Sequence, residues 1–319
     1  MLEKNLDNGI LRGWLILTLT FLFAALAPFI GPFVVILTPL PVLYFTSLLS
    51  RFRGFSVLAA SFVTAYGVLS LLKQQINLPM LFMIALIGLV LSEIIKRNLS
   101  FEKTVLAAAL LLFSCGVGFI LYNSYRANIA PWELIENYVA IVVKENLEFY
   151  KKLNIPQEQI EMLKEKTPQI TRFFAGIFPA LGISGSVVTV WANLLAGQML
   201  FRLRGIPFPD FGDLTTWKAP EKLVWVLIAA GGMLFVPVEG IIILGMNLLI
   251  LTCLIYLFQG LAITAFFFRK KQILRMFRVF FYGLIIIQQY LLIFVIALGL
   301  FDLWIDFRKR IKDVKNVNI

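Results

Sequence analysis

Amide side chains within long uncharged runs are the residues of this sequence best suited to bind a polar molecule. Asn193 and Gln198, with Trp191 close by, lie in the run between Arg172 and Arg202. An amide in hydrocarbon needs a partner on a neighbouring helix or in a water-filled cavity. The pattern predicts either a polar ligand site near the middle of a membrane or an interhelical hydrogen bond worth about 0.6–2 kcal/mol.

The same run contains residues that weaken helices. It has 29 uncharged residues, or about 43 Å of helix, which exceeds a hydrocarbon core of about 30 Å. A helix broken at Pro179, Gly182 and Gly185 would expose backbone groups to a substrate. Gly and Pro are also ordinary constituents of membrane helices, so this run crosses a bilayer with either a tilt or a break.

A second pair of amides, Asn247 and Gln259, lies in another uncharged run, which follows Glu239. The two amides are 12 positions apart, about 120° around a helix, so we do not expect one shared site unless the helix breaks near Gly260. Glu239 stands in a Pro-Val-Glu-Gly turn between two apolar runs. An interfacial acid is a functional candidate, although at a turn it is more often hydrated.

The sequence offers little for catalysis. It contains no His, which removes His-dependent acid–base chemistry and most zinc and copper sites. Cys115 and Cys253 lie in apolar runs and are more typical of packing than of a redox pair. The acids Glu93, Glu239 and Asp302 are too scattered to predict a catalytic pair, and no phosphate or dinucleotide loop is present. We predict no catalytic residue, no metal and no cofactor.

The composition is that of a membrane protein. Of 319 residues, 60% are hydrophobic and 15% are charged, and the mean hydropathy is +0.88, whereas a soluble domain is about 45–50% apolar. The net charge of +11 does not indicate a nucleic-acid partner, because the basic residues cluster at the ends of apolar runs, as in proteins oriented by positive charge. The lipid bilayer is the predicted partner.

Uncharged runs of about twenty residues predict the membrane spans. The predicted fold is all-α, with eight or nine transmembrane helices in two blocks, 1–125 and 168–319. The first run is long enough for two helices, with a turn at Pro28, Gly31 and Pro32. The runs are 13–50, 54–72, 74–92 and 104–125 in the first block and 173–201, 223–238, 240–268 and 279–301 in the second.

Residues 126–167 are polar and periodic, and they predict a central amphipathic helical hairpin outside the membrane. Asn154 with Gln157 is a capping box for its second helix. The hairpin fits best on or just above the outer membrane surface, and a solvated loop folded on the neighbouring spans fits about as well. The apolar positions near helical spacing are Leu134, Tyr138, Ile141, Val142, Phe149 and Leu153.

Charge placement predicts a cytoplasmic N-terminus. Four basic clusters then fall inside and the hairpin falls outside. Nine crossings would put the basic C-terminal tail outside, so either the last run is re-entrant around Gln288 and Gln289 or the tail is a tolerated exception. The clusters are Arg51/Arg53, Lys96/Arg97/Lys103, Arg202/Arg204/Lys218/Lys222 and Arg269/Lys270/Lys271/Arg275/Arg278, and the tail contains Arg308, Lys309, Arg310, Lys312 and Lys315.

Short motifs resemble the YybS-like family of uncharacterised bacterial membrane proteins. They are Pro39-Leu40-Pro41, Gln259-Gly260-Leu261-Ala262, and Gly299-Leu300-Phe301-Asp302-Leu303-Trp304 followed by Asp306-Phe307-Arg308. This resemblance implies a bacterial cytoplasmic membrane and no known activity. More remotely, block 1–125 resembles the substrate-binding components of energy-coupling-factor vitamin transporters, whose first helix carries an Ala-x-x-x-Ala face. Here Ala24 is followed four positions later by Pro28.

Two functions remain open on these observations. The first is a protein that binds or transports a small polar molecule or a lipid between its two blocks, energised by other subunits if at all. The second is a structural or assembly scaffold that docks a membrane or cytoplasmic protein partner. A cavity lined by Asn193, Gln198, Asn247 and Gln259 would favour the first, and a dry core with paired amides would favour the second.

Overall fold

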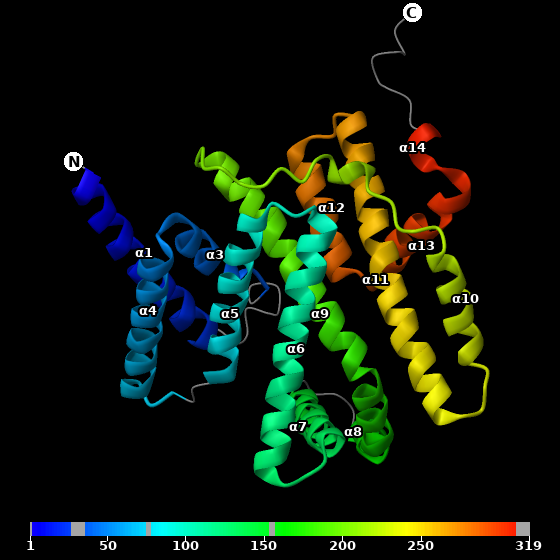
Figure 1. The fold of residues 1–319 in the computed structure, drawn as a ribbon. Helices are drawn as coiled ribbons and strands as arrows, with labels where there is room; N and C mark the ends of the chain where they lie inside the picture. Colours follow the sequence, from blue (N-terminus) through cyan, green and yellow to red (C-terminus); the bar gives the residue numbers. More distant parts are fainter. Residues whose placement is uncertain (1, 27–35, 75–77, 153–156, 311–319) are drawn as a thin grey trace, which may run out of the picture. The chain divides into compact units, whose positions relative to one another are not determined.

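The computed structural model describes residues 2–26, 36–74, 78–152 and 157–310 (Figure 1). These residues form helices joined by turns and contain no strand, which confirms the all-α prediction. Some predicted features lie outside the described residues: the turn at Pro28, Gly31 and Pro32, the residue Asn154 of the capping box, and Lys312 and Lys315 of the tail.

Contacts divide the chain into two compact units. Unit 1 comprises Met1–Phe119 and Gly185–Phe211. Leu17 and Phe21 of its first helix pack with Ala65, Leu69 and Leu81 of the next helices in one apolar core. Its helices are α1 (Leu2–Leu26), α3 (Pro39–Leu48), α4 (Arg51–Leu71), α5 (Leu78–Ile94), the 3-10 turn η2 (Ile95–Arg97) and the first part of α6 (Phe101–Ala127), together with the second part of α9 (Thr167–Leu203), which is green in Figure 1.

Unit 2 comprises Ile120–Ser184 and Gly212–Ile319. Besides its parts of α6 and α9, it contains two polar helices and a group of apolar ones built on a central long helix, α11, against which α10 and α13 pack. The elements are α7 (Pro131–Lys152), α8 (Gln157–Glu165), the 3-10 turn η3 (Leu214–Thr216), α10 (Leu223–Met233), α11 (Glu239–Lys270), α12 (Arg275–Ile287), α13 (Gln289–Ile305) and α14 (Phe307–Arg310).

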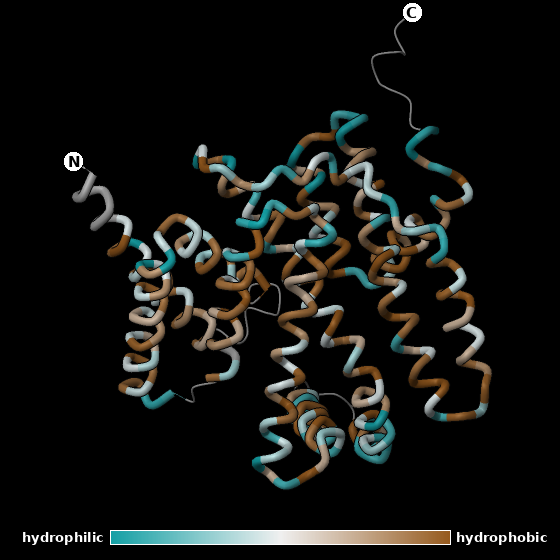
Figure 2. Tube along the Cα trace, viewed as in Figure 1, coloured by the Kyte–Doolittle hydropathy of each residue, from teal (hydrophilic) through white to brown (hydrophobic). Residues whose placement is uncertain are grey.

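Apolar helices of membrane-spanning length confirm the prediction of a membrane protein. Five helices among the described residues qualify, namely α1 from Gly9, α4, α6, α9 and α11, and the count is up to six if α12 and α13 form one broken span. Apolar residues predominate along these helices (Figure 2), and many of their large apolar side chains are exposed. Two shorter apolar helices, α3 and α10, add to these, and the count of eight or nine spans stays a prediction.

The last apolar run is broken at the position that the amides indicated. Helices α12 and α13 meet at 105°, and Gln288 between them has extended backbone angles, φ −102° and ψ 105°. Each helix is too short to cross about 30 Å comfortably. The pair therefore has the shape of a broken span or a re-entrant segment.

Helix α9 corrects one hypothesis. The structure has a single helix from Thr167 to Leu203, 37 residues long, with Pro179 inside it. The proposed break at Pro179, Gly182 and Gly185 is therefore wrong as a backbone interruption. The hydrogen bonds that keep this helix continuous are described below.

The central polar segment forms two helices, α7 and α8, which pack against each other. Leu147 of α7 and Ile160 of α8 are buried, whereas Tyr138, Ile141 and Phe149 are each more than half exposed. Much of the predicted apolar face is thus not covered by other residues of this chain. Whether the segment lies outside the membrane stays a prediction.

Helices α11 and α13 touch backbone to backbone. A Cβ on Gly260 would lie 2.0 Å from the carbonyl oxygen of Val295, and a Cβ on Gly299 would lie 2.0 Å from that of Tyr256. Only a residue without a side chain permits such an approach between helices. These two glycines bring the polar ends of α11 and α13 within hydrogen-bonding distance.

Candidate functional site

Asn193 forms a hydrogen bond between distant segments of unit 1. It lies in the second part of α9 and is fully buried. Its Nδ2 donates to the carbonyl oxygen of Ile36 at 2.6 Å and to that of Thr189 at 2.8 Å. Its Oδ1 has no hydrogen-bond partner within the described part of the chain. Trp191 and Gln198, the other candidates in this helix, are half-buried.

Asn247 of α11 forms hydrogen bonds with the backbone of α9 next to Pro179. Its Oδ1 accepts from the amide of Ala180 at 2.9 Å, and its Nδ2 donates to the carbonyl of Gly176 at 2.8 Å. These two backbone groups would bond each other in a regular helix, because they are separated by one helical turn. Pro179 lacks a donor and its ring crowds the preceding turn. The amide of a neighbouring helix therefore satisfies the backbone that a proline disturbs.

Gln259 belongs to a different cluster, at the crossing of α11 and α13. Its side chain is 1% exposed. Its Oε1 accepts from the amide of Ala219 at 3.0 Å, and its Nε2 donates to Oδ2 of Asp302 at 3.1 Å. Asn247 and Gln259 thus have different partners, as their spacing predicts.

Asp302 is the centre of this cluster. It is 2% exposed, and an ionised carboxylate taken out of water needs a partner cation and hydrogen bonds. Arg308 Nη1 lies 2.9 Å from its Oδ2, and the amide of Phe307 donates to its Oδ1 at 2.9 Å. Both donors come from the short helix α14. The chain reverses onto Asp302 because Asp306 adopts a left-handed conformation, φ 44°, which Asp tolerates better than most residues.

The remaining N–H donors of Arg308 form hydrogen bonds with the loop that precedes α10. Its Nε donates to the carbonyl of Thr215 at 3.1 Å, and its Nη2 donates to that of Trp217 at 2.8 Å. Together with the bond from Ala219 to Gln259, they fasten residues 215–219 along most of their length. We call the cluster of Gln259, Asp302 and Arg308 the buried triad.

Exposed ion pairs fasten the same loop on the outside. Asp213 receives both guanidinium arms of Arg269, at 2.9 and 2.7 Å, and Lys218 lies 3.3 Å from Asp306. The hydrogen bond from Arg269 is the largest effect that lowers the pKa of Asp213, to about 2. Because the pKa is depressed, this pair contributes its stability in full above about pH 4 and loses it only as the pH falls through about 2. It is intact at physiological pH.

The six predicted ligand-binding residues are divided between the two units. Asn193 and Gln198 belong to unit 1, whereas Asn247, Gln259 and Glu239 belong to unit 2. Glu239 is exposed at the start of α11, at the turn after α10. No group of three or more His, Cys, Asp or Glu side chains that could hold a metal is found within the described ranges. A ligand at these six residues stays a prediction.

Sequence reasoning missed Asp302 and Arg308 as a site. They are 6 positions apart, which does not match the three- or four-residue spacing of a helical ion pair. The available signal was an acid at the end of an apolar run, which is a functional candidate in a membrane protein, followed by a basic cluster. The motifs that resembled a known family contain all three residues of the buried triad.

Long apolar helices with hydrogen-bonded amides and a buried ion pair at their ends define a polytopic helical membrane protein. The chain belongs to the family described as predicted membrane protein (DUF2232), whose family model matches residues 15–303. No curated protein matches the chain, and no solved structure matches it. The more specific resemblances, to the YybS-like family and to energy-coupling-factor components, stay hypotheses.

Replacing Asn247 by Leu should destabilise the protein by about 1–3 kcal/mol, because it leaves the amide of Ala180 and the carbonyl of Gly176 unpaired. In a Pro179→Ala background these two groups can bond each other, so the same replacement should cost clearly less. Thermal unfolding in detergent of the wild type, both single variants and the double variant measures this coupling. Equal costs in both backgrounds would show that Asn247 does not compensate for the proline.

Breaking the buried ion pair on one side should cost about 3–5 kcal/mol, because the remaining charge is buried without a partner. Asp302→Asn and Arg308→Gln should each lower the melting temperature more than the double variant does. Lys309→Gln is the matched control, since this side chain is 83% exposed and should change little. Additive effects of the two single variants would contradict the pairing.

Proposed function

We propose that this protein is a structural or assembly protein of the membrane, which holds a protein partner at its cytoplasmic face. The observation that supports the proposal is the use of its polar side chains. Asn247 and the buried triad bond to the protein's own backbone and side chains, as in the dry core expected of a scaffold. The bonds of the buried triad fix residues 215–219 in one conformation, and an ordered surface loop costs less entropy when it binds.

The surface around the fixed loop suits an acidic partner. We call this surface the platform: residues 213–222, the C-terminal end of α11, the start of α12, and α14. Asp213, and Asp306 next to α14, are each paired with cations, whereas Lys222 and Arg275 are exposed, as is the acid Glu221. Complementary charge increases the rate and the specificity of association with an acidic surface.

A specific observation favours the alternative, which is binding or transport of a small molecule or lipid. Asn193 Oδ1 is fully buried without a partner among the described residues, and a buried acceptor left unpaired is costly. A polar ligand or a water that donates to this oxygen would remove that cost. This alternative places the ligand at Asn193 and assigns no role to the platform.

The two functions predict that different molecules co-purify with the protein. We expect a protein partner to co-elute with the wild type in lipid nanodiscs and to be lost from Lys222→Glu combined with Arg275→Glu, because the positive surface is reversed. Arg126→Glu, at the end of α6 and away from the platform, is the control and should retain it. A small molecule found by mass spectrometry, retained by the platform variant and lost from Asn193→Leu, would contradict the scaffold.

The proposed topology has eight crossings, with both termini and the platform in the cytoplasm and helices α7 and α8 outside. The support comes from unit 2, where one loop bonds Arg269 at the end of α11 and Arg308 after α13. The pair α12–α13 would thus leave and return on one side, as a re-entrant segment. Glu239 and Gln259 are 20 residues apart, about 30 Å of helix, so the buried triad would lie at the inner membrane boundary.

Labelling of single cysteines tests this topology. In a Cys115→Ser, Cys253→Ser background, Arg310→Cys and Lys222→Cys should be protected from a membrane-impermeant maleimide in intact cells, because both would lie inside. Glu239→Cys should be labelled, because it would lie at the outer turn. Labelling of Arg310→Cys together with Glu239→Cys would contradict the re-entrant segment and favour nine crossings.

A further inference from the structure

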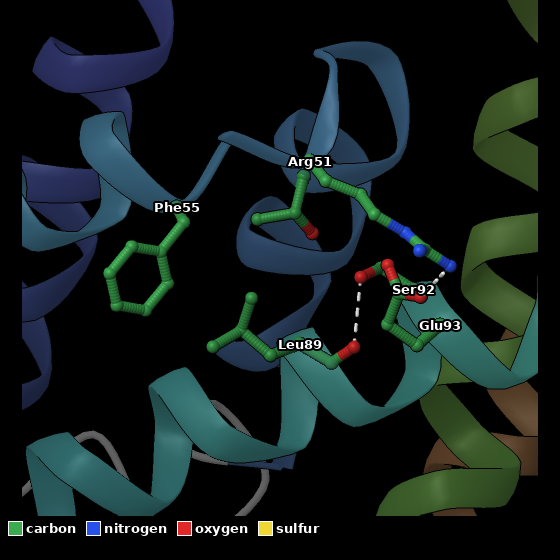
Figure 3. A pocket seen from close by; sticks show the side chains of 6 residues that line it. Arg51, Phe55, Leu89, Ser92 and Glu93 are labelled. Carbon is green, nitrogen blue, oxygen red and sulfur yellow. Dashed lines mark hydrogen bonds and ion pairs between the residues drawn. The ribbon is translucent and has the colours of Figure 1, made fainter. Parts of the chain in front are cut away.

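A pocket of about 320 Å³ opens at the junction of α3, α4 and α5 in unit 1. Its lining changes from polar to apolar. Figure 3 shows Arg51, Ser92 and Glu93 gathered at one end, Phe55 at the other and Leu89 between them. Thr46 of α3 completes the lining.

The acid at the polar end is paired with two cations, Arg51 of the lining and Lys96 beside it. Glu93 accepts from Arg51 Nη2 at 2.9 Å and from Lys96 Nζ at 2.6 Å, so one carboxylate faces two cations. Lys96 follows Glu93 by three positions, whereas Arg51 comes from the neighbouring helix α4. The Arg51 side chain is 80% exposed. The guanidinium is therefore accessible to an anion from solvent, and its side chain does not have to move out of the core first.

The apolar end of the pocket lies one helical turn away from the polar end, toward the middle of α4 and α5. Arg51 is the first residue of α4, and Phe55 follows it by one turn. Glu93 lies in the last turn of α5, and Leu89 precedes it by one turn. Both apolar walls thus lie farther along their helices from the charged ends, and Phe55 is 60% exposed. This gradient matches a molecule with a charged head and a hydrocarbon tail at the membrane–water interface.

The hydroxyl groups of the lining are oriented as acceptors. Ser92 donates its proton to the carbonyl of Leu89 at 2.8 Å, and Thr46 donates to that of Val42 at 2.6 Å. Their oxygens, like the carboxylate of Glu93, can accept from a donor that enters the pocket. The pocket therefore presents cations for an anion and acceptors for an N–H donor next to each other.

We propose that this pocket binds the headgroup of a phospholipid that carries both a phosphate and a primary ammonium, with part of an acyl chain against Phe55 and Leu89. The phosphate is held by Arg51 and Lys96 and the ammonium by Glu93, so that the headgroup is inserted into an existing ion pair. This site is separate from the platform and does not depend on a protein partner.

Binding of phosphatidylethanolamine to the full-length protein in detergent, followed by native mass spectrometry, tests the proposal. Arg51→Gln should weaken the first bound lipid about tenfold, as expected for loss of a charged hydrogen bond. Phe55→Ser should weaken it as well, because the acyl contact is lost. Arg126→Gln is the matched control and should bind as the wild type does. Both altered residues are exposed, and unchanged melting temperatures verify that the variants are folded.

Competition distinguishes a lipid from free phosphate. Inorganic phosphate and soluble phosphoethanolamine at millimolar concentration should leave the bound lipid in place, since neither has a chain for the apolar end. Displacement by either compound, or unchanged lipid binding in Arg51→Gln or in Phe55→Ser, would overturn the proposal. A preference for phosphatidylglycerol, which lacks the ammonium, would also overturn it.

Discussion

The buried carboxylate of Asp302 determines how unit 2 is arranged at the ends of α11 and α13. An ionised group with 2% exposure is tolerated only with a cation and hydrogen bonds around it. Gln259, Phe307 and Arg308 supply these, and Gln259 and Arg308 also bond residues 215–219. The left-handed turn at Asp306, the position of α14 and the path of residues 215–219 all follow from that requirement. The glycine contact of α11 with α13 brings Gln259 within reach.

The same physical constraint acts at Pro179. A helix in hydrocarbon cannot leave its backbone groups unpaired, and Asn247 of a neighbouring helix bonds the amide of Ala180 and the carbonyl of Gly176 next to the proline. The side-chain amides of the apolar helices thus serve here as hydrogen-bond partners for the backbone of other segments. This use of polar side chains is the reason why we favour a rigid scaffold over a ligand channel.

The features that depend on local composition could be predicted from the sequence. Run length and hydropathy predict the long helices, and the amides at Gln288 and Gln289 indicate where the last run breaks. The exposure of Glu239 follows from its place in a Pro-Gly turn. These features need only neighbouring residues, so no knowledge of tertiary contacts is required.

The missed features all depend on pairing between distant residues. Arg51 meets Glu93 across 42 positions, and Asn193 meets Ile36 across 157. Arg308 reaches Asp302 only because the chain reverses between them, and the partner of the α9 backbone next to Pro179 is Asn247 of another helix, α11. Tertiary packing determines which distant residues meet, and the periodicity of the sequence contains no information about that packing.

Hydrogen–deuterium exchange of the loop tests the central role of the buried triad most directly. The amides of Ala219 and Phe307, which donate to Gln259 and Asp302, should exchange slowly in the wild type. Both should exchange much faster in Asp302→Ala, although only Phe307 contacts that residue through its amide, because release of Arg308 frees the loop as well. Fast exchange at Ala219 in the wild type, or an unchanged rate there in the variant, would contradict the account.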